Sequence, residues 1–176
     1  MREKCIKRVG EMKWILLLMV FLVAPAVLQV SSLPETQEQH RTQIDLYMPA
    51  YSERYCRIGP PVYVLSRISP FSVYQQSIHC WRVDYNAFGQ KLFELHLYAV
   101  WRYDGYRIVE VLPPSCWTAT YLGWYTSAGP YCGWSYVLTT SAKAYAQATF
   151  SHPLVPSQTR WVYAYVYGDG TGYCGG

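Results

Sequence analysis

The sequence predicts an all-β protein, an antiparallel β-sandwich or partly open barrel of roughly seven to nine strands. From Tyr47 onward aromatic and β-branched residues dominate, and Gly, Pro, Asn or Asp interrupt them about every eight to twelve residues, as in folds made of short strands. No stretch keeps an apolar period of about 3.6 residues for three turns, the pattern of a surface helix. A single β-sandwich domain over residues 47–176 is therefore expected.

Residues 1–26 are predicted to be a signal peptide. Five basic and two acidic residues lie within the first 13, and an apolar run from Trp14 to Leu28 follows. Ala24-Pro25-Ala26 supplies a small-x-small pattern, so cleavage near Ala26 is expected. The alternative is an uncleaved anchor, because the run extended to Val30 reaches the lower limit for a membrane span. Cleavage predicts a secreted, extracellular protein, and a retained leader predicts a cell-surface protein that contacts the membrane through that leader alone.

The mature chain is expected to be near neutral. The whole chain has 15 basic and 11 acidic residues, so without the first 13 residues ten basic and nine acidic residues leave a net charge of +1. Nucleic-acid binding depends on neutralising phosphates with clustered cations, so this partner is excluded. The polar residues 27–46 are expected to form a flexible segment before the domain.

The cysteines predict disulfides, because exported chains normally oxidise theirs. Cysteine-rich metal or redox sites have no support, since the chain lacks a C-x-x-C motif, and neither a metal nor another cofactor is expected. Beyond Cys5 in the leader the number of cysteines is odd, so one is expected to remain outside the intrachain disulfides or to pair between chains. The candidate for that role is Cys174, in a glycine-rich tail, and the candidates for intrachain disulfides are Cys56, Cys80, Cys116 and Cys132.

Residues 78–112 predict a three-stranded meander with a defined register. A five-residue loop at 86–90 pairs Tyr85 with Lys91, and a two-residue loop at 104–105 pairs Tyr103 with Tyr106. Both loops give the same alternation of faces, which supports the register because a one-residue slip would exchange the faces. The expected inner face holds Trp81, Val83, Tyr85, Phe93, Leu95, Leu97, Ala99, Trp101, Tyr103 and Ile108, and the other face Arg82, Glu94, His96, Arg102 and Arg107. Cys80 is expected opposite His96, and Glu110 is a misfit that parity places inward.

The last part of the chain raises the main question about function. Ala142, Ala144, Ala146, Ala148 and Phe150 alternate with other residues, which favours a strand over a helix. A later strand carries the aromatic row Trp161, Tyr163, Tyr165 and Tyr167, with Val162, Ala164 and Val166 on its other side. The favoured interpretation is a core of rings packed over the alanines. The alternative is an exposed ladder for binding. Tyr167, beside Gly168, is expected to be the most exposed member of the row.

The sequence contains no motif that fixes a reaction. It has no G-x-S-x-G, H-E-x-x-H, P-loop or dinucleotide fingerprint, and no catalytic residue is predicted. Glu94 and His96 share a face as a possible metal pair, but no third ligand falls at a matching position in the expected register, so the pair alone is weak support for a metal site. The acidic residues of the meander are scattered, although a glycosidase needs two carboxylates facing each other across a cleft.

These observations favour a secreted, non-catalytic contact module. Its aromatic surface would bind a polysaccharide or a second copy of the chain, through the Trp161–Tyr167 row or through a group formed by Trp117, Trp124 and Trp134. The first alternative is a small extracellular hydrolase of glycans whose acids converge in three dimensions. The second is a secreted toxin or antimicrobial that acts on cell envelopes, for which a near-neutral charge is a poor fit.

Overall fold

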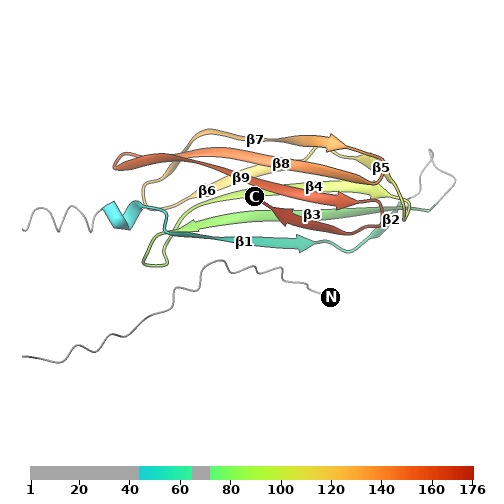
Figure 1. Cartoon of the computed structure of the whole chain (residues 1–176), viewed down its shortest axis with the longest axis horizontal. Helices are drawn as coiled ribbons and strands as arrows, with labels where there is room; N and C mark the ends of the chain where they lie inside the picture. Colours follow the sequence, from blue (N-terminus) through green and yellow to red (C-terminus); the bar gives the residue numbers. More distant parts are fainter. Residues whose placement is uncertain (1–43, 65–71) are drawn as a thin grey trace, which may run out of the picture.

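The protein folds as a sandwich of two antiparallel sheets, as the sequence predicts. The computed structural model describes residues 44–64 and 72–176, which form ten strands along the long axis of the molecule (Figure 1). Sheet A contains β1 (Tyr51–Ile58), β2 (Val62–Val64), β3 (Val73–Tyr85), β4 (Lys91–Tyr103), β5 (Ile108–Val111) and β6 (Ser115–Thr120). Sheet B contains β7 (Tyr125–Val137), β8 (Ser141–His152), β9 (Val155–Tyr167) and β10 (Gly172–Gly175).

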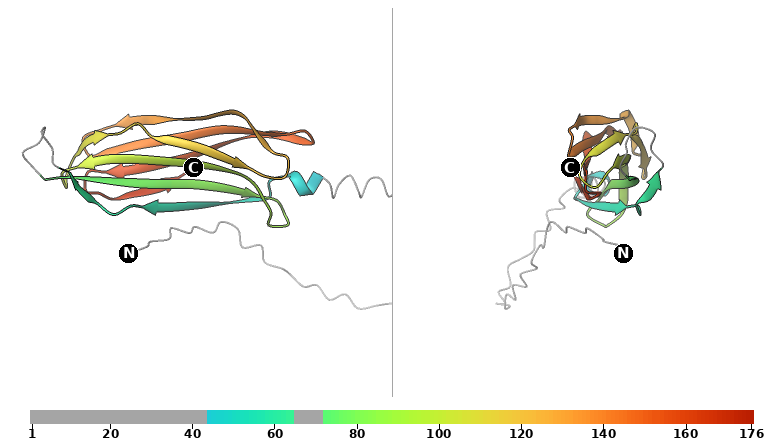
Figure 2. Two further views of the ribbon diagram at one scale, coloured as in Figure 1. Left: turned by 180° about the vertical axis from the view of Figure 1, so that it is seen from behind. Right: turned by 90° about the vertical axis from the view of Figure 1, so that its right-hand side faces the viewer.

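The strand order of sheet A is β1-β3-β4-β5, with β2 pairing with β3 and β6 with β4, and that of sheet B is β10-β9-β8-β7. Seen along the long axis, the two sheets form opposite walls around the core (Figure 2). The expected leader over residues 1–26 lies outside the described residues. Of the expected flexible segment, residues 44–46 belong to a short helical turn, from which Ile44 packs against the core. Within the described ranges, no helix is long and apolar enough to cross a membrane.

The core contains large side chains from sheet A packed against small ones from sheet B. Strand β4 contributes Phe93, Leu95, Leu97, Ala99, Trp101 and Tyr103, which is the inward face predicted for this strand. Strand β8 contributes its alanine stripe and Phe150, which confirms a strand at 141–150 with these residues on one face. The alanines and the rings of β4 belong to one core cluster, in which Phe93 stacks on Phe150 with ring centroids 4.3 Å apart.

The register between β3 and β4 differs from the prediction by one residue. Tyr85 pairs with Lys91 as expected, but Asp84 pairs with Phe93, so Leu92 is an extra residue in a bulge. Leu92 and Phe93 are both fully buried, and the bulge is what lets two consecutive apolar side chains enter the core. The prediction for β3 is therefore wrong. Trp81, Val83 and Tyr85 lie on the outer face, Arg82 lies on the inner face, and His96 is paired with Trp81 instead of Cys80.

The hairpin after β4 also differs from its predicted form. The turn contains four residues, because Tyr103 pairs with Ile108, and the Asp104 carboxylate accepts hydrogen bonds from the backbone N–H groups of Tyr106 and Arg107 within it. These hydrogen bonds, led by the one from Tyr106, hold the pKa of Asp104 below its usual value. Tyr103 pairs with Ile108, and a bulge then places Glu110 opposite Arg102. The predicted pairing of Arg102 with Arg107 and the inward position of Glu110 are wrong, and the pairing of Arg102 with Glu110 produces an ion pair.

Gly105 in this turn tests the hairpin. Its φ is +98°, and a Cβ atom placed on it would meet nothing within 4 Å. We expect Gly105→Val to lower the free energy of unfolding by about 1–3 kcal/mol, because a β-branched residue is strained at positive φ. Thermal denaturation measures the effect. Tyr106→Val, at the exposed neighbouring position, is the control and should stay within about 0.5 kcal/mol; equal stability of both variants would contradict the turn geometry.

Among the described residues, two disulfides connect the sheets on opposite flanks of the sandwich. Cys80 on β3 bonds to Cys174 on β10, and Cys116 on β6 bonds to Cys132 on β7. The assignment of Cys174 as the cysteine outside the intrachain disulfides is therefore wrong. Strand β10 pairs with β9 and is not a mobile tail, which brings Cys174 against the inner face of sheet A. Cys56 is the cross-strand partner of Cys80, and its sulfur lies within 4.8 Å of the sulfurs of Cys80 and Cys174.

Candidate functional site: two aromatic outer faces

Strand β9 turns its aromatic row away from the core. Val162, Ala164 and Val166 are 3%, 0% and 0% exposed and belong to the core cluster. Because side chains alternate along a strand, Trp161, Tyr163, Tyr165 and Tyr167 lie on the outer side of sheet B. The favoured interpretation of this row as core is wrong, and its placement matches the alternative of an outer ladder. Trp161, which is 38% exposed, is the most exposed member, in place of the expected Tyr167.

The aromatic row is held in a continuous stack with one cation. The Lys143 ammonium lies 4.0 Å from the ring centroid of Tyr163 and 5.1 Å from that of Tyr165. Tyr173 on β10 stacks on Tyr165 at 4.6 Å, and Trp161 stacks beside Tyr163 at 6.1 Å. Each ring thus has a neighbour that restricts its rotation. The surface is ordered before any partner arrives, which lowers the entropy cost of binding.

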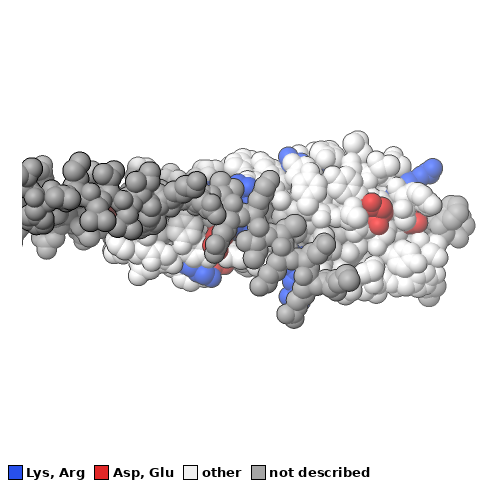
Figure 3. All heavy atoms as spheres, turned by 60° about the horizontal axis from the view of Figure 1, so that its bottom comes forward, with Lys and Arg blue, Asp and Glu red and all other residues white. Residues whose placement is uncertain are grey.

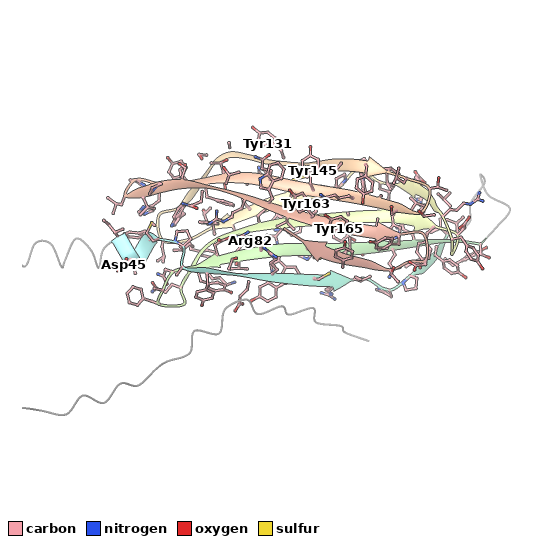
Figure 4. The ribbon with its side chains drawn as sticks, viewed as in Figure 1. Asp45, Arg82, Tyr131, Tyr145, Tyr163 and Tyr165 are labelled. Atoms are coloured by element: carbon pink, nitrogen blue, oxygen red, sulfur yellow. A yellow bond between two sulfur atoms is a disulfide. The ribbon has the colours of Figure 1, made fainter. Side chains whose placement is uncertain are left out.

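Further tyrosines extend the surface across sheet B. Tyr145 on β8 is paired with Tyr163 on one side and with Gly133 of β7 on the other. The Tyr145 ring lies close to Gly133, since a Cβ atom placed on this glycine would be 3.4 Å from the ring. Tyr131 projects from β7 beyond Tyr145 (Figure 4). We call this surface the tyrosine face and define it as Tyr131, Tyr136, Lys143, Tyr145, Gln147, Trp161, Tyr163, Tyr165, Tyr167 and Tyr173.

The tyrosine face has no carboxylate. Strands β7, β8, β9 and β10 contain no Asp or Glu at any position. A hydrogen bond with Tyr165 raises the pKa of Lys143, which keeps this side chain protonated. Burial, followed by a hydrogen bond with Tyr173, raises the pKa of Tyr167. The face can therefore offer hydroxyl groups, ring edges and one positive charge, but no acidic group for general acid–base catalysis.

The three tryptophans predicted as an alternative contact group are not brought together. Trp117 is 43% exposed on the outer side of sheet A. Trp124 is only 4% exposed and contacts Phe93 edge-on, and its indole N–H has no hydrogen-bond partner among the described residues. Trp134 packs against the core and donates its indole N–H to the Leu112 carbonyl at 2.8 Å. Of these three tryptophans, only Trp117 is exposed enough to contact a binding partner.

Trp117 belongs to a second cluster, on the outer face of sheet A. His79 Nε2 lies 3.2 Å from His96 Nδ1, and His96 Nε2 lies 3.0 Å from a carboxylate oxygen of Glu94. The indole of Trp117 stacks on His96 with ring centroids 4.8 Å apart, and that of Trp81 stacks on His79 at 4.5 Å. We call His79 and His96 the imidazole pair. Charged side chains are scattered over the part of the surface that Figure 3 shows.

Burial sets the protonation of the imidazole pair. The pKa of His79 is lowered to about 4, mainly by burial and in addition by the positive charges that His96 and Arg57 can carry. Burial also lowers the pKa of His96, against the opposing effect of its hydrogen bond with Glu94. Burial alone would raise the pKa of Glu94, but hydrogen bonds from Lys91, Tyr121 and His96 outweigh it and leave this pKa lowered. At neutral pH both rings are neutral and the carboxylate is charged.

Sequence reasoning missed this pair because of the register error. The predicted register places Cys80 opposite His96 and turns His79 toward the core, whereas the Leu92 bulge moves His79 and Trp81 to the side of His96. The available signal was the pair of consecutive apolar residues Leu92 and Phe93 directly after the loop, both of which needed burial.

Comparisons of the chain with family models, with curated proteins and with solved structures find no match.

Proposed function

We propose that the protein is a secreted, non-catalytic contact module that binds an extended polysaccharide chain through its tyrosine face. The observation that carries this proposal is the outward aromatic row of β9, whose opposite side is core. Rings two residues apart on a strand are separated by about 6.6–6.8 Å, so the row from Trp161 to Tyr167 extends over roughly 20 Å. A straight row of this length is suited to a linear polymer.

The chemistry of the tyrosine face agrees with a sugar ligand. A phenol hydroxyl both donates and accepts hydrogen bonds, as sugar hydroxyls do, and ring edges and faces supply apolar contact. Tyrosine also has few rotatable bonds, so little conformational entropy is lost when it binds. The two disulfides support an extracellular location, because such bonds persist in oxidising compartments.

Charge favours a polysaccharide over a second copy of the chain. Two tyrosine faces packed about a two-fold axis would each bring Lys143, with no carboxylate on either face to neutralise it. Like charges placed together in an interface suppress association. The lack of Asp and Glu also argues against hydrolysis on this surface, since glycoside cleavage normally requires paired carboxylates.

The proposal is tested by the double variant Tyr163→Ala/Tyr165→Ala. We expect its retention on insoluble polysaccharides such as cellulose and chitin to fall at least about tenfold, equivalent to ~1.4 kcal/mol of binding free energy. We expect its thermal stability to change little, about 1 kcal/mol for each substitution, because the rings lie outside the core. Pull-down assays and thermal denaturation measure the two effects.

Tyr63→Ala is the matched control, since Tyr63 is an exposed tyrosine on β2 of the other sheet. Its retention should equal that of the unchanged protein. Unaltered binding by the double variant would overturn the proposal. So would sedimentation showing a dimer that the double variant abolishes while polysaccharide binding is absent, because that result assigns the tyrosine face to self-association.

A further inference from the structure

The imidazole pair has the spacing of two ligands on one metal ion. In a tetrahedral zinc site the nitrogens lie about 2.0–2.1 Å from the ion, which places two of them roughly 3.3–3.4 Å apart. His79 Nε2 and His96 Nδ1 are 3.2 Å apart. They come from neighbouring strands of one sheet, β3 and β4, where they are diagonal neighbours, since His79 pairs with Tyr98 and His96 with Trp81. In the structure the 3.2 Å separation is that of a hydrogen bond between the rings, so an ion would replace the shared proton and each ring would turn to aim its lone pair at the ion.

Hydrogen bonds direct a lone pair of His96 toward this point. A charged carboxylate only accepts hydrogen bonds, so Glu94 fixes the proton of His96 on Nε2 and leaves a lone pair on Nδ1. His79 then donates its Nε2–H to that lone pair. If His79 carries its proton on Nδ1 instead, both facing nitrogens offer lone pairs to a cation. This exchange of tautomers leaves the ring neutral.

Glu94 also supplies the outer support that metal-binding histidines usually have. A ligating imidazole commonly donates its second N–H to a carboxylate, which fixes the ring and increases its basicity. Glu94 is 7% exposed and is held by Lys91 Nζ at 2.7 Å and by the Tyr121 hydroxyl at 3.0 Å. His96 is itself 9% exposed. The carboxylate–imidazole unit is thus ordered without any ligand.

We propose that His79 and His96 bind one divalent transition-metal ion of the class of Cu²⁺, Ni²⁺ and Zn²⁺. Imidazole nitrogen is a preferred ligand of all three ions. Water would fill the remaining coordination positions. Arg57 is paired with His79 across β1 and β3, and its positive charge repels a cation. This repulsion limits the affinity of the site for the metal ion. This inference is independent of the tyrosine face, which lies on the other sheet.

Titration of the full chain with Cu²⁺, followed by tryptophan fluorescence, tests the proposal. An ion held by the pair would lie beside Trp81 and Trp117, the indoles stacked on His79 and His96, and paramagnetic Cu²⁺ quenches nearby indoles. We expect saturable quenching with one ion per chain. His79→Gln should weaken it at least about tenfold, and calorimetry should show Zn²⁺ binding at the same site more weakly than Cu²⁺.

Three further variants define the site. His152→Gln is the matched control, because His152 lies at the end of β8 and stacks on Tyr47, and its affinity for Cu²⁺ should be unchanged. Glu94→Gln should weaken binding about 10–100-fold by releasing His96, and Arg57→Gln should strengthen it by removing a positive charge. Thermal denaturation identifies variants that remain folded. Equal Cu²⁺ affinity of a folded His79→Gln variant and the unchanged protein would overturn the proposal, as would loss of the quenching in His152→Gln.

Discussion

Asp84→Ala is expected to lower the free energy of unfolding by about 3–5 kcal/mol. Asp84 is 2% exposed on the inner face of β3 and accepts hydrogen bonds from Arg82 on its own strand and from Arg160 on β9. Each Arg Nε lies 2.9 Å from a carboxylate oxygen. Removal of the carboxylate would leave two largely buried guanidinium groups unpaired between the sheets. Denaturation with urea measures the loss.

Two comparisons separate charge pairing from packing in this cluster. Glu110→Ala breaks the ion pair with Arg102 on the exposed surface and should cost at most about 1 kcal/mol. Replacing Arg82, Asp84 and Arg160 together with apolar residues should cost less than Asp84→Ala alone, because no charge is then left unpaired. A triple variant less stable than the single one would show that the ion cluster contributes net stability.

The double variant Cys80→Ala/Cys174→Ala is expected to lose about 4–5 kcal/mol of stability, as the entropy of closing a long loop predicts. The bond joins residues separated by 94 positions and connects β3 to β10, a strand of only four residues at the edge of sheet B. Both cysteines are replaced so that neither sulfur is left without its disulfide partner. Urea denaturation of the oxidised proteins measures the change.

The other disulfide provides the comparison. Cys116 and Cys132 are separated by only 16 positions, so Cys116→Ala/Cys132→Ala should cost about 3 kcal/mol by the same argument. The long-loop variant should therefore unfold at the lower urea concentration. The reverse order would show that strain or local contacts, and not loop closure, determine what each disulfide contributes.

The sequence was sufficient to predict the fold class and the inward face of its central strands. Alternation of apolar and other residues along 93–103 and 142–150 identified the buried positions of β4 and β8, because a side-chain period of two has only two possible phases and burial selects one. The same reasoning correctly assigned the alanine stripe to a strand. It also gave the pairing of Tyr85 with Lys91 from the loop length.

The sequence was not sufficient where a single extra residue changes the phase. The bulge at Leu92 inverted β3, and with it the identity of the residues beside His96. The Asp104 carboxylate stabilised a longer turn than Asp-Gly usually forms. The aromatic row of β9 has no polar side, so alternation could not say which side is core. That choice depended on the opposite sheet, whose large side chains form one core cluster with Val162, Ala164 and Val166.

The lack of acidic residues in sheet B also fixes how its outer face responds to the medium. Most protein surfaces change charge between pH 3 and 6, where Asp and Glu take up protons. The tyrosine face has no such group, and its one cation, Lys143, has a pKa raised above the ordinary value of 10.5. The face therefore keeps a constant charge from acid to mildly alkaline conditions. Contacts made there should be as strong in an acidified medium as in a neutral one.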